Sequence, residues 1–127
     1  EGRAMSTILV VDDEQMLCDL LKDELSNCGH EVVTAITGRD GIALFTQRRP
    51  DLTLLDLHMP EMSGIVVLKQ IRALDPQARV IILTGGATSV WENQARELGV
   101  TEFLLKGVSL NILVRALGKA MQSPGQA

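Results

Sequence analysis

The sequence predicts a single α/β domain in which helices cover both faces of a parallel β-sheet. Five short apolar runs recur at nearly even spacing, and a longer amphipathic segment follows each of them. Strands that are apolar along their whole length are typical of a parallel sheet buried on both faces. Alternating strands and helices imply right-handed crossovers, which produce a doubly wound (βα)5 domain. The length of 127 residues fits one such domain.

Each element can be assigned in chain order. The predicted strands are Ile8–Val11, Val32–Val33, Leu52–Leu55, Val80–Leu83 and Phe103–Leu105. The predicted helices are residues 15–27, 39–48, 64–74, 89–98 and 109–122. The first helix carries leucines at helical spacing, at positions 17, 20, 21 and 25, and Gly29 supplies its C-cap. Asp75-Pro76 ends the third helix, and Gly99 follows the fourth.

The predicted domain spans residues 7–122. Residues 1–6 form an N-terminal extension, in which residues 1–4 look like a non-native remnant and Met5 fits a native start. Residues 123–127 look like a tail or the start of a linker. The net charge of −4 argues against nucleic-acid or anionic-membrane binding by this domain. No apolar run approaches the ~20 residues that span a bilayer, and we expect a cytoplasmic protein.

The chain has two cysteines, Cys18 and Cys28. If one helix carries both, about 15 Å of helical rise separates them, which is too far for a disulfide. Their spacing matches no zinc motif. We therefore expect two free, buried thiols, which suits a reducing cytoplasm.

Polar side chains follow four of the five predicted strands. Asp12 and Asp13 follow the first strand, Asp56 the third, Thr84 the fourth and Lys106 the fifth. The carboxyl ends of parallel strands meet at one edge of a sheet, where ligands usually bind. Two carboxylates about 5 Å apart repel by roughly 3 kcal/mol at an effective dielectric near 20.

The lysine offsets part of this repulsion, and a divalent cation would offset more. Oxygen ligands of this kind suit Mg²⁺. We therefore expect Asp56 to stand at the lip of the sheet rather than in the core.

Four stretches carry a resemblance to a known family: Val10–Glu14, Leu55–Gly64, Ile82–Gly85 and Phe103–Lys106. They resemble the receiver domains of response regulators in two-component signalling, a fold shared with chemotaxis regulators. The resemblance covers residues 7–122. It implies a flavodoxin-like sheet with strand order 2-1-3-4-5, and a switch that accepts a phosphoryl group and slowly loses it by self-hydrolysis. It does not imply an enzyme acting on a separate substrate.

The resemblance also implies a metal site around the phosphoacceptor. Asp56 would take a phosphoryl group from a phosphohistidine, with Mg²⁺ or Mn²⁺ as cofactor. Asp13 would bind the metal directly and Asp12 through water. The backbone carbonyl of His58 would be the remaining protein ligand.

Three further residues match the family's switch. Thr84 would move to bond the phosphoryl oxygen, Lys106 would pair with the phosphoryl group, and Phe103 would swing inward on activation. Gly107 stands where the family usually has proline after the lysine, which leaves open whether the Lys106–Gly107 bond is cis or trans. The side chain of His58 lies two residues past Asp56 and could influence hydrolysis.

Partners follow from the resemblance as well. These are a sensor histidine kinase or phosphotransfer protein, a homodimer through the face of the fourth helix, fifth strand and fifth helix, and a C-terminal effector domain. We expect Trp91 on or near that face, with partial burial as the alternative.

Two other functions compete. A pseudo-receiver would keep the fold and bind proteins without taking phosphate. A phosphatase of the haloacid dehalogenase type would need a second aspartate where the chain has His58.

Overall fold

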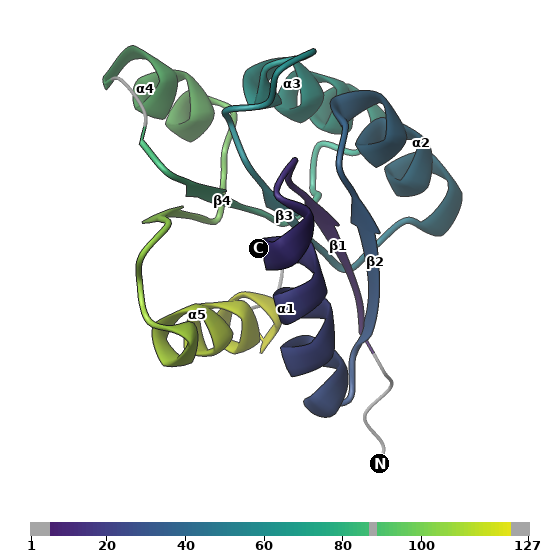
Figure 1. Ribbon diagram of the computed structural model, residues 1–127. Coiled ribbons are helices and arrows are strands. Elements are labelled where there is room, and N and C mark those ends of the chain that lie inside the picture. The colour runs from purple at the N-terminus through teal and green to yellow at the C-terminus, as the bar shows by residue number, and fades with distance from the viewer. Residues whose placement is uncertain (1–5, 87–88, 123–127) are drawn as a thin grey trace.

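The computed structural model describes residues 6–86 and 89–122. Its centre is a five-stranded parallel sheet formed by β1 (Thr7–Val11), β2 (Glu31–Ala35), β3 (Leu52–Leu55), β4 (Val80–Thr84) and β5 (Glu102–Leu105). The strand order is β2-β1-β3-β4-β5 (Figure 1). The predicted fold class, the strand order and the approximate position of every strand are therefore confirmed.

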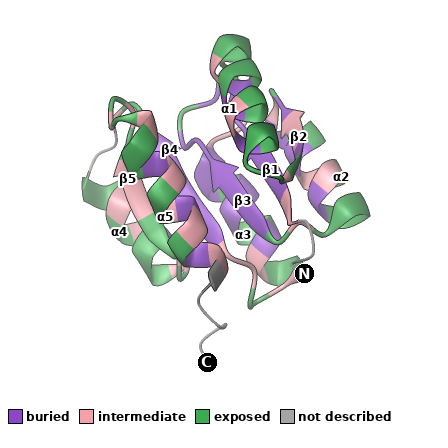
Figure 2. Ribbon diagram, turned by 90° about the horizontal axis from the view of Figure 1, so that it is seen from below, coloured by how far each residue is buried: buried purple, intermediate pink, exposed green. Residues whose placement is uncertain are grey.

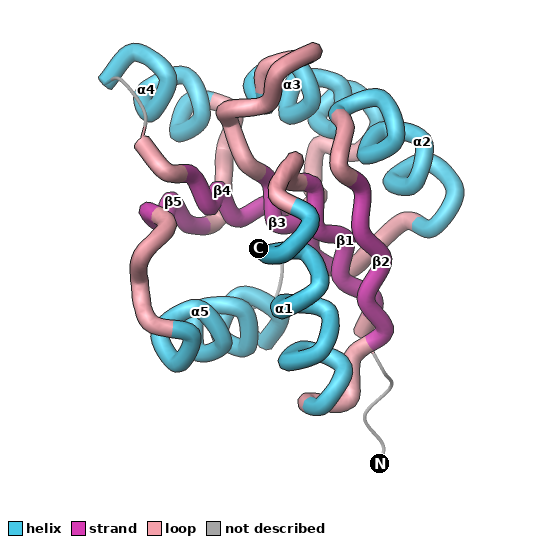
Figure 3. Tube along the Cα trace, in the orientation of Figure 1, coloured by secondary structure: helices cyan, strands magenta, loops and turns pink. Residues whose placement is uncertain are grey.

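Five helices alternate with the strands: α1 (Gln15–Asn27), α2 (Gly38–Arg48), α3 (Gly64–Leu74), α4 (Ser89–Glu97) and α5 (Leu110–Gln122). Helices α1 and α5 lie on one side of the sheet, and α2, α3 and α4 lie on the other (Figures 1 and 3). The molecule is thus the three-layered, doubly wound domain that the alternating pattern predicted.

The core consists of two apolar clusters, one on each face of the sheet. Cys18 and Leu21 of α1 pack with Leu113 of α5 on one face. Phe45 of α2 and Leu68 of α3 pack on the other. Strands β3 and β4 are buried along their whole length, as their continuous apolar runs predict (Figure 2).

The edge strands differ from the expectation of full burial. In β5 no residue is fully buried, and Leu105 is 54% exposed. An edge strand has only one neighbour, so part of its apolar surface stays open to solvent. Figure 2 shows the contrast between β5 and the buried central strands.

Helix α1 ends in a Schellman motif. Gly29 has a φ of +93° and donates its N–H to the carbonyl of Ser26, and His30 donates to the carbonyl of Leu25. The helix stops at Asn27, so Cys28 is exposed, and the prediction of two buried thiols is wrong for this cysteine. Leu20 is also 49% exposed, because it lies on the flank of the helix that faces away from the sheet.

No helix in the part of the chain that the structure describes is long and apolar enough to cross a bilayer. The predicted remnant at residues 1–4 and the predicted tail at 123–127 lie outside the described residues. The domain limits at residues 7 and 122 stay predictions.

Candidate functional site

Three carboxylates meet beyond the adjacent strands β1 and β3. Asp12 and Asp13 follow β1, and Asp56 follows β3, where its N–H donates to the carbonyl of Val11 at 3.0 Å. One oxygen from each carboxylate lies within 4.8 Å of the others. Asp12 and Asp56 are only 3% and 2% exposed, whereas Asp13 is open to solvent. Asp56 therefore stands directly after its strand, at the lip of the sheet as expected, but its side chain is buried there.

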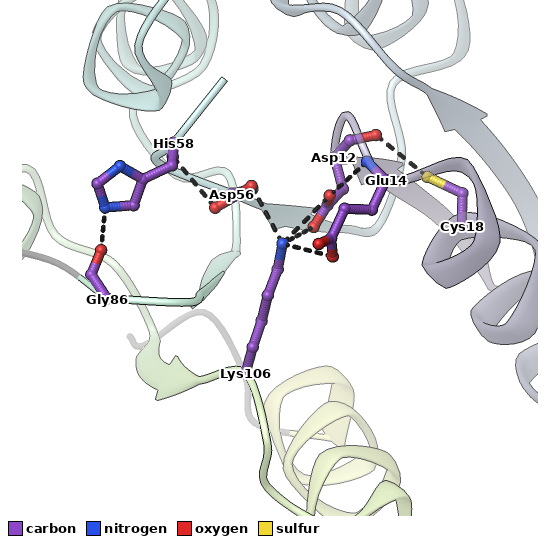
Figure 4. A network of polar contacts seen from close by, with 7 residues as sticks. All are labelled: Asp12, Glu14, Cys18, Asp56, His58, Gly86 and Lys106. Carbon is purple, nitrogen blue, oxygen red and sulfur yellow. Dashed lines mark hydrogen bonds and ion pairs between the residues drawn. The ribbon is translucent and has the colours of Figure 1, made fainter. Parts of the chain in front are cut away.

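Lys106 reaches this cluster from the end of β5. Its N–H donates to the carbonyl of Thr84 at 2.7 Å, which ties its backbone to β4. The ammonium Nζ lies 3.0 Å from Asp12 and 3.2 Å from Asp56 (Figure 4). The described residues contain no cis peptide bond, so Lys106–Gly107 is trans, and Gly107 adopts a φ of +104° that suits glycine.

Burial and charge act on these groups in opposite directions. Burial alone would lower the pKa of Lys106, but the hydrogen bonds that its ammonium donates to Glu14 and Asp12, with the charges of Asp12 and Asp56, raise that pKa above the ordinary lysine value. Burial raises the pKa of Asp12, and the neighbouring Asp56 adds to the rise, although the Glu14 N–H and Lys106 oppose it. The lysine is therefore a fixed positive charge, whereas burial makes the charged form of Asp12 costly.

The raised pKa of Asp12 predicts a specific pH dependence in metal-free protein. A carboxyl whose pKa is higher in the folded state stabilises the fold below its unfolded pKa, and this contribution is lost as pH rises through the folded value. We expect the free energy of unfolding of the wild type, measured in chelator, to fall relative to Asp12→Asn from about pH 4 upward. Urea unfolding at several pH values measures the difference in free energy of unfolding between the two proteins. A difference that stays constant, or a wild type that becomes more stable relative to Asp12→Asn as pH rises, contradicts the prediction.

The loop between Asp56 and α3 is held by close packing and capping. Gly64 donates its N–H to the carbonyl of Leu57 at 2.9 Å, and a Cβ at Gly64 would lie 2.2 Å from the carbonyl oxygen of Asp56. Ser63 caps α3, and Glu61 accepts a hydrogen bond from the N–H of Gly38 at the start of α2. These contacts hold the backbone of the loop that begins at Asp56, and so they position this residue.

Thr84 lies on β4, next to the strand that leads to Asp56, and Phe103 lies on β5, the edge strand. In the sheet register Thr84 pairs with Leu105, so the threonine sits on β4 between the strand of Asp56 and the strand of Lys106. Its side-chain hydroxyl is fully buried and has no hydrogen-bond partner among the described residues. Phe103 is half-buried, and the guanidinium of Arg96 lies 5.5 Å from its ring centroid.

His58 connects the Asp56 loop to the loop after β4. Its N–H donates to an Asp56 carboxylate oxygen at 3.1 Å, and its ring nitrogen Nε2 contacts the carbonyl of Gly86 (Figure 4). Its ring also packs on Trp91 of α4, with 4.7 Å between the ring centroids. Trp91 is half-buried, so the alternative expectation of partial burial holds for it. The sequence did not predict the contact between His58 and Trp91, because α4 and the Asp56 loop are distant in the chain.

The Asp12, Asp13 and Asp56 group fits a hard divalent cation. Its donors are all carboxylate oxygens, which Mg²⁺ prefers, and two of the three are buried. Glu14 was not singled out from the sequence, although its carboxylate lies 2.9 Å from Lys106 Nζ. The signal available was its place directly after Asp12-Asp13, where a long acidic side chain can reach the same edge of the sheet.

Comparison with known proteins decides the family. The family model described as the response regulator receiver domain matches residues 8–118. The chain belongs to this family. As a receiver domain it is a component of two-component signalling, and relatives of this kind are signalling proteins.

The relatives include free-standing receiver domains and longer regulators. The chain is 32% identical to the chemotaxis protein CheY of Thermotoga maritima, over 88% of this chain and 94% of that protein. It is 34% identical to the transcriptional regulatory protein ZraR of Salmonella typhimurium, over 94% of this chain but only 27% of ZraR. The crystal structure of a CheY-like receiver domain protein from Methanospirillum hungatei JF-1 superposes with a TM-score of 0.90 at 27% identity, covering 93% of this chain and 94% of that one.

Proposed function

We propose that this receiver domain is a phosphorylatable switch whose acceptor is Asp56. The observation that carries the proposal is the surroundings of this carboxylate: it is buried at a strand end, 3.2 Å from Lys106 and grouped with Asp12 and Asp13. A hollow of about 610 Å³ opens over it, lined also by His58 and Lys106, and leaves room for an incoming phosphoryl group. A sensor histidine kinase or a phosphotransfer protein would supply that group.

The proposed chemistry is a phosphoryl transfer between two nucleophiles. A carboxylate oxygen of Asp56 attacks the phosphorus of a phosphohistidine, the P–N bond breaks with its electron pair left on the imidazole, and an acyl phosphate forms. Lys106 pairs with the charge that develops on the phosphoryl oxygens. Asp12, Asp13, Asp56 and the backbone carbonyl of His58 would hold Mg²⁺ or Mn²⁺, which supplies neutralisation of negative charge. Later hydrolysis of the acyl phosphate resets the switch.

The buried Thr84 hydroxyl supports a switching role for its strand. A buried hydroxyl without a partner costs about 1–3 kcal/mol, and a phosphoryl oxygen on Asp56 would offer it an acceptor. Moving Thr84 toward Asp56 would then make space into which half-buried Phe103 can turn. We propose that this rearrangement alters the face formed by α4, β5 and α5, where Val90, Leu105 and Ile112 are exposed.

That face is the proposed output surface. It would carry a homodimer contact or a contact with an effector domain in a longer protein, and the proposed setting is the cytoplasm. With a net charge of −4 the domain itself is not expected to bind nucleic acid. No substrate turnover beyond its own phosphorylation and dephosphorylation is expected.

Intact-mass spectrometry tests the proposed function directly. The protein is incubated with acetyl phosphate, with and without Mg²⁺, as wild type and as Asp56→Asn. We expect the wild type to gain one phosphoryl group only with Mg²⁺, and the variant to gain none because the amide is not a nucleophile. A wild type that gains nothing would favour the phosphorylation-independent binding module instead. A variant that gains as much as the wild type would move the acceptor to another residue.

A further inference from the structure

The ammonium of Lys106 meets three carboxylates. Its Nζ lies 2.9 Å from Glu14, 3.0 Å from Asp12 and 3.2 Å from Asp56 (Figure 4). A lysine ammonium has three N–H donors, so the three carboxylates can occupy all of them. The contact with Glu14 is the shortest of the three.

Glu14 differs from the other two carboxylates in what else it can bind. Asp12 and Asp56 belong to the group of oxygens that fits a cation, whereas Glu14 does not. A cation bound by the two aspartates would compete with the lysine for their charge, which would weaken their hold on its ammonium. Because Glu14 is not part of that group, its carboxylate would stay available to Lys106 when the cation is bound.

The backbone of Glu14 is well fixed for such a task. Its N–H donates to an Asp12 carboxylate oxygen at 2.9 Å, and its carbonyl accepts from the N–H of Cys18 at the start of α1. Glu14 stands at the N-cap position of α1, but its side chain makes no capping hydrogen bond. The carboxylate is instead directed to Lys106.

Among the described residues, the Lys106 ammonium has hydrogen-bond partners only in these three carboxylates, and the backbone that follows it is open. Lys106 is followed by Gly107, which has a φ of +104°, is exposed, and has open space where a Cβ would point. Glycine leaves the chain more freedom than any other residue would. The four-carbon stem of Lys106 is flexible in its own right, so an additional acidic partner helps to keep its ammonium beside Asp56.

We propose that Glu14 is a positioning residue that holds the Lys106 ammonium in place for phosphoryl transfer to Asp56. The proposal deepens the proposed function and rests on it for the kinetic part. Because the Glu14 carboxylate is 58% exposed, its effect is modest: surface ion pairs of this kind contribute up to about 1 kcal/mol, which corresponds to a change of about two- to fivefold.

The first test needs no phosphorylation. Trace acetylation with acetic anhydride in Mg²⁺, read by peptide mass spectrometry, measures how accessible the Lys106 amine is. Glu14→Gln should raise the labelling of Lys106 by about two- to fivefold, because the amine loses a charged partner. The control Asp19→Asn removes the same charge from exposed Asp19, which accepts a hydrogen bond from Gln15, and should leave Lys106 labelling unchanged. Equal labelling in Glu14→Gln and wild type would overturn the proposal.

The second test separates the lysine from the metal. Phosphorylation rates with acetyl phosphate are measured against Mg²⁺ concentration. If Glu14 acts through Lys106, the rate of Glu14→Gln stays about two- to fivefold low at saturating Mg²⁺, and Glu14→Gln has no further effect in a Lys106→Ala background. A rate restored by saturating Mg²⁺, or an equal effect in both backgrounds, would overturn the proposal. A wild type that takes no phosphate refutes the proposed function, while the labelling test still decides the anchoring role.

Discussion

Gly64→Ala should destabilise the domain by at least about 3 kcal/mol and should displace Asp56. A Cβ at this position would lie 2.2 Å from the Asp56 carbonyl oxygen and 2.6 Å from the Leu57 Cα. Both atoms are backbone, so the clash cannot be relieved by rotating a side chain. Severe overpacking of this kind costs more than the 1–3 kcal/mol that is typical of extra methylenes in a core.

Chemical denaturation and phosphorylation by acetyl phosphate together measure the two consequences. We expect a lower denaturation midpoint and slower uptake of the phosphoryl group, because the carbonyl and the carboxylate of Asp56 belong to one residue. Gly118→Ala is the matched control: Gly118 lies in α5 with nothing within 4 Å of its added Cβ, and alanine should stabilise that helix by up to about 1 kcal/mol. Equal stability of Gly64→Ala and wild type would contradict the prediction, because it would mean that the loop shifts to accommodate the added Cβ without losing stability.

The spacing of apolar residues predicted the sheet and the helices, because in the middle of the domain the apolar positions of the sequence are also the buried positions of the structure. Strands β3 and β4 are buried on both faces, and their short, continuous apolar runs between turn residues are what such strands require. Strand β5 has a similar run, yet it is an edge strand, and a sequence does not say which run will have only one neighbour. The strand order came from the family resemblance rather than from the pattern.

The candidate site was predictable as far as it depends on strand ends. Asp12, Asp56 and Lys106 follow different strands, and the geometry of a parallel sheet is enough to bring them together. The burial of Asp56 was not predictable, because it depends on the Gly64 packing and on Lys106 covering the carboxylate. The end of α1 at Asn27 was predicted correctly, but the exposure of Cys28 was not, because this residue is the C-cap and lies beyond the last helical turn, where helical spacing no longer says which side chains face the core.

Contacts between long side chains were also not predicted from the sequence. Lys106 with Glu14 and His58 with Trp91 join residues that are far apart in the chain. Each contact requires a specific rotamer as well as a specific backbone position, and the sequence pattern constrains only the second. These are also the contacts that distinguish this chain from a generic sheet with acidic strand ends.

Lys106→Met should destabilise the metal-free protein by about 2–4 kcal/mol at neutral pH. The substitution leaves the buried carboxylates of Asp12 and Asp56 without their common cation, and breaking a buried pair by removing one partner typically costs 3–5 kcal/mol. The expected loss is smaller because the Lys106 side chain is 19% exposed, which lets water screen part of the interaction.

Mg²⁺ should reduce that loss while leaving the proposed chemistry impaired. A cation that binds only the folded state stabilises it by about 2.7 kcal/mol at 100 times its dissociation constant. The variant should gain more from Mg²⁺ than the wild type does, because no ammonium competes for the carboxylates. Phosphorylation should still be slower on the order of 10²-fold at saturating Mg²⁺, since a charge-stabilising donor is missing. Thermal unfolding with and without Mg²⁺, and intact-mass kinetics, measure the two effects, with Lys69→Met of α3 as the control for losing one exposed lysine. If Mg²⁺ restored the full rate as well as the stability, the role of Lys106 would be to balance charge in the metal-free site and not to assist the transfer.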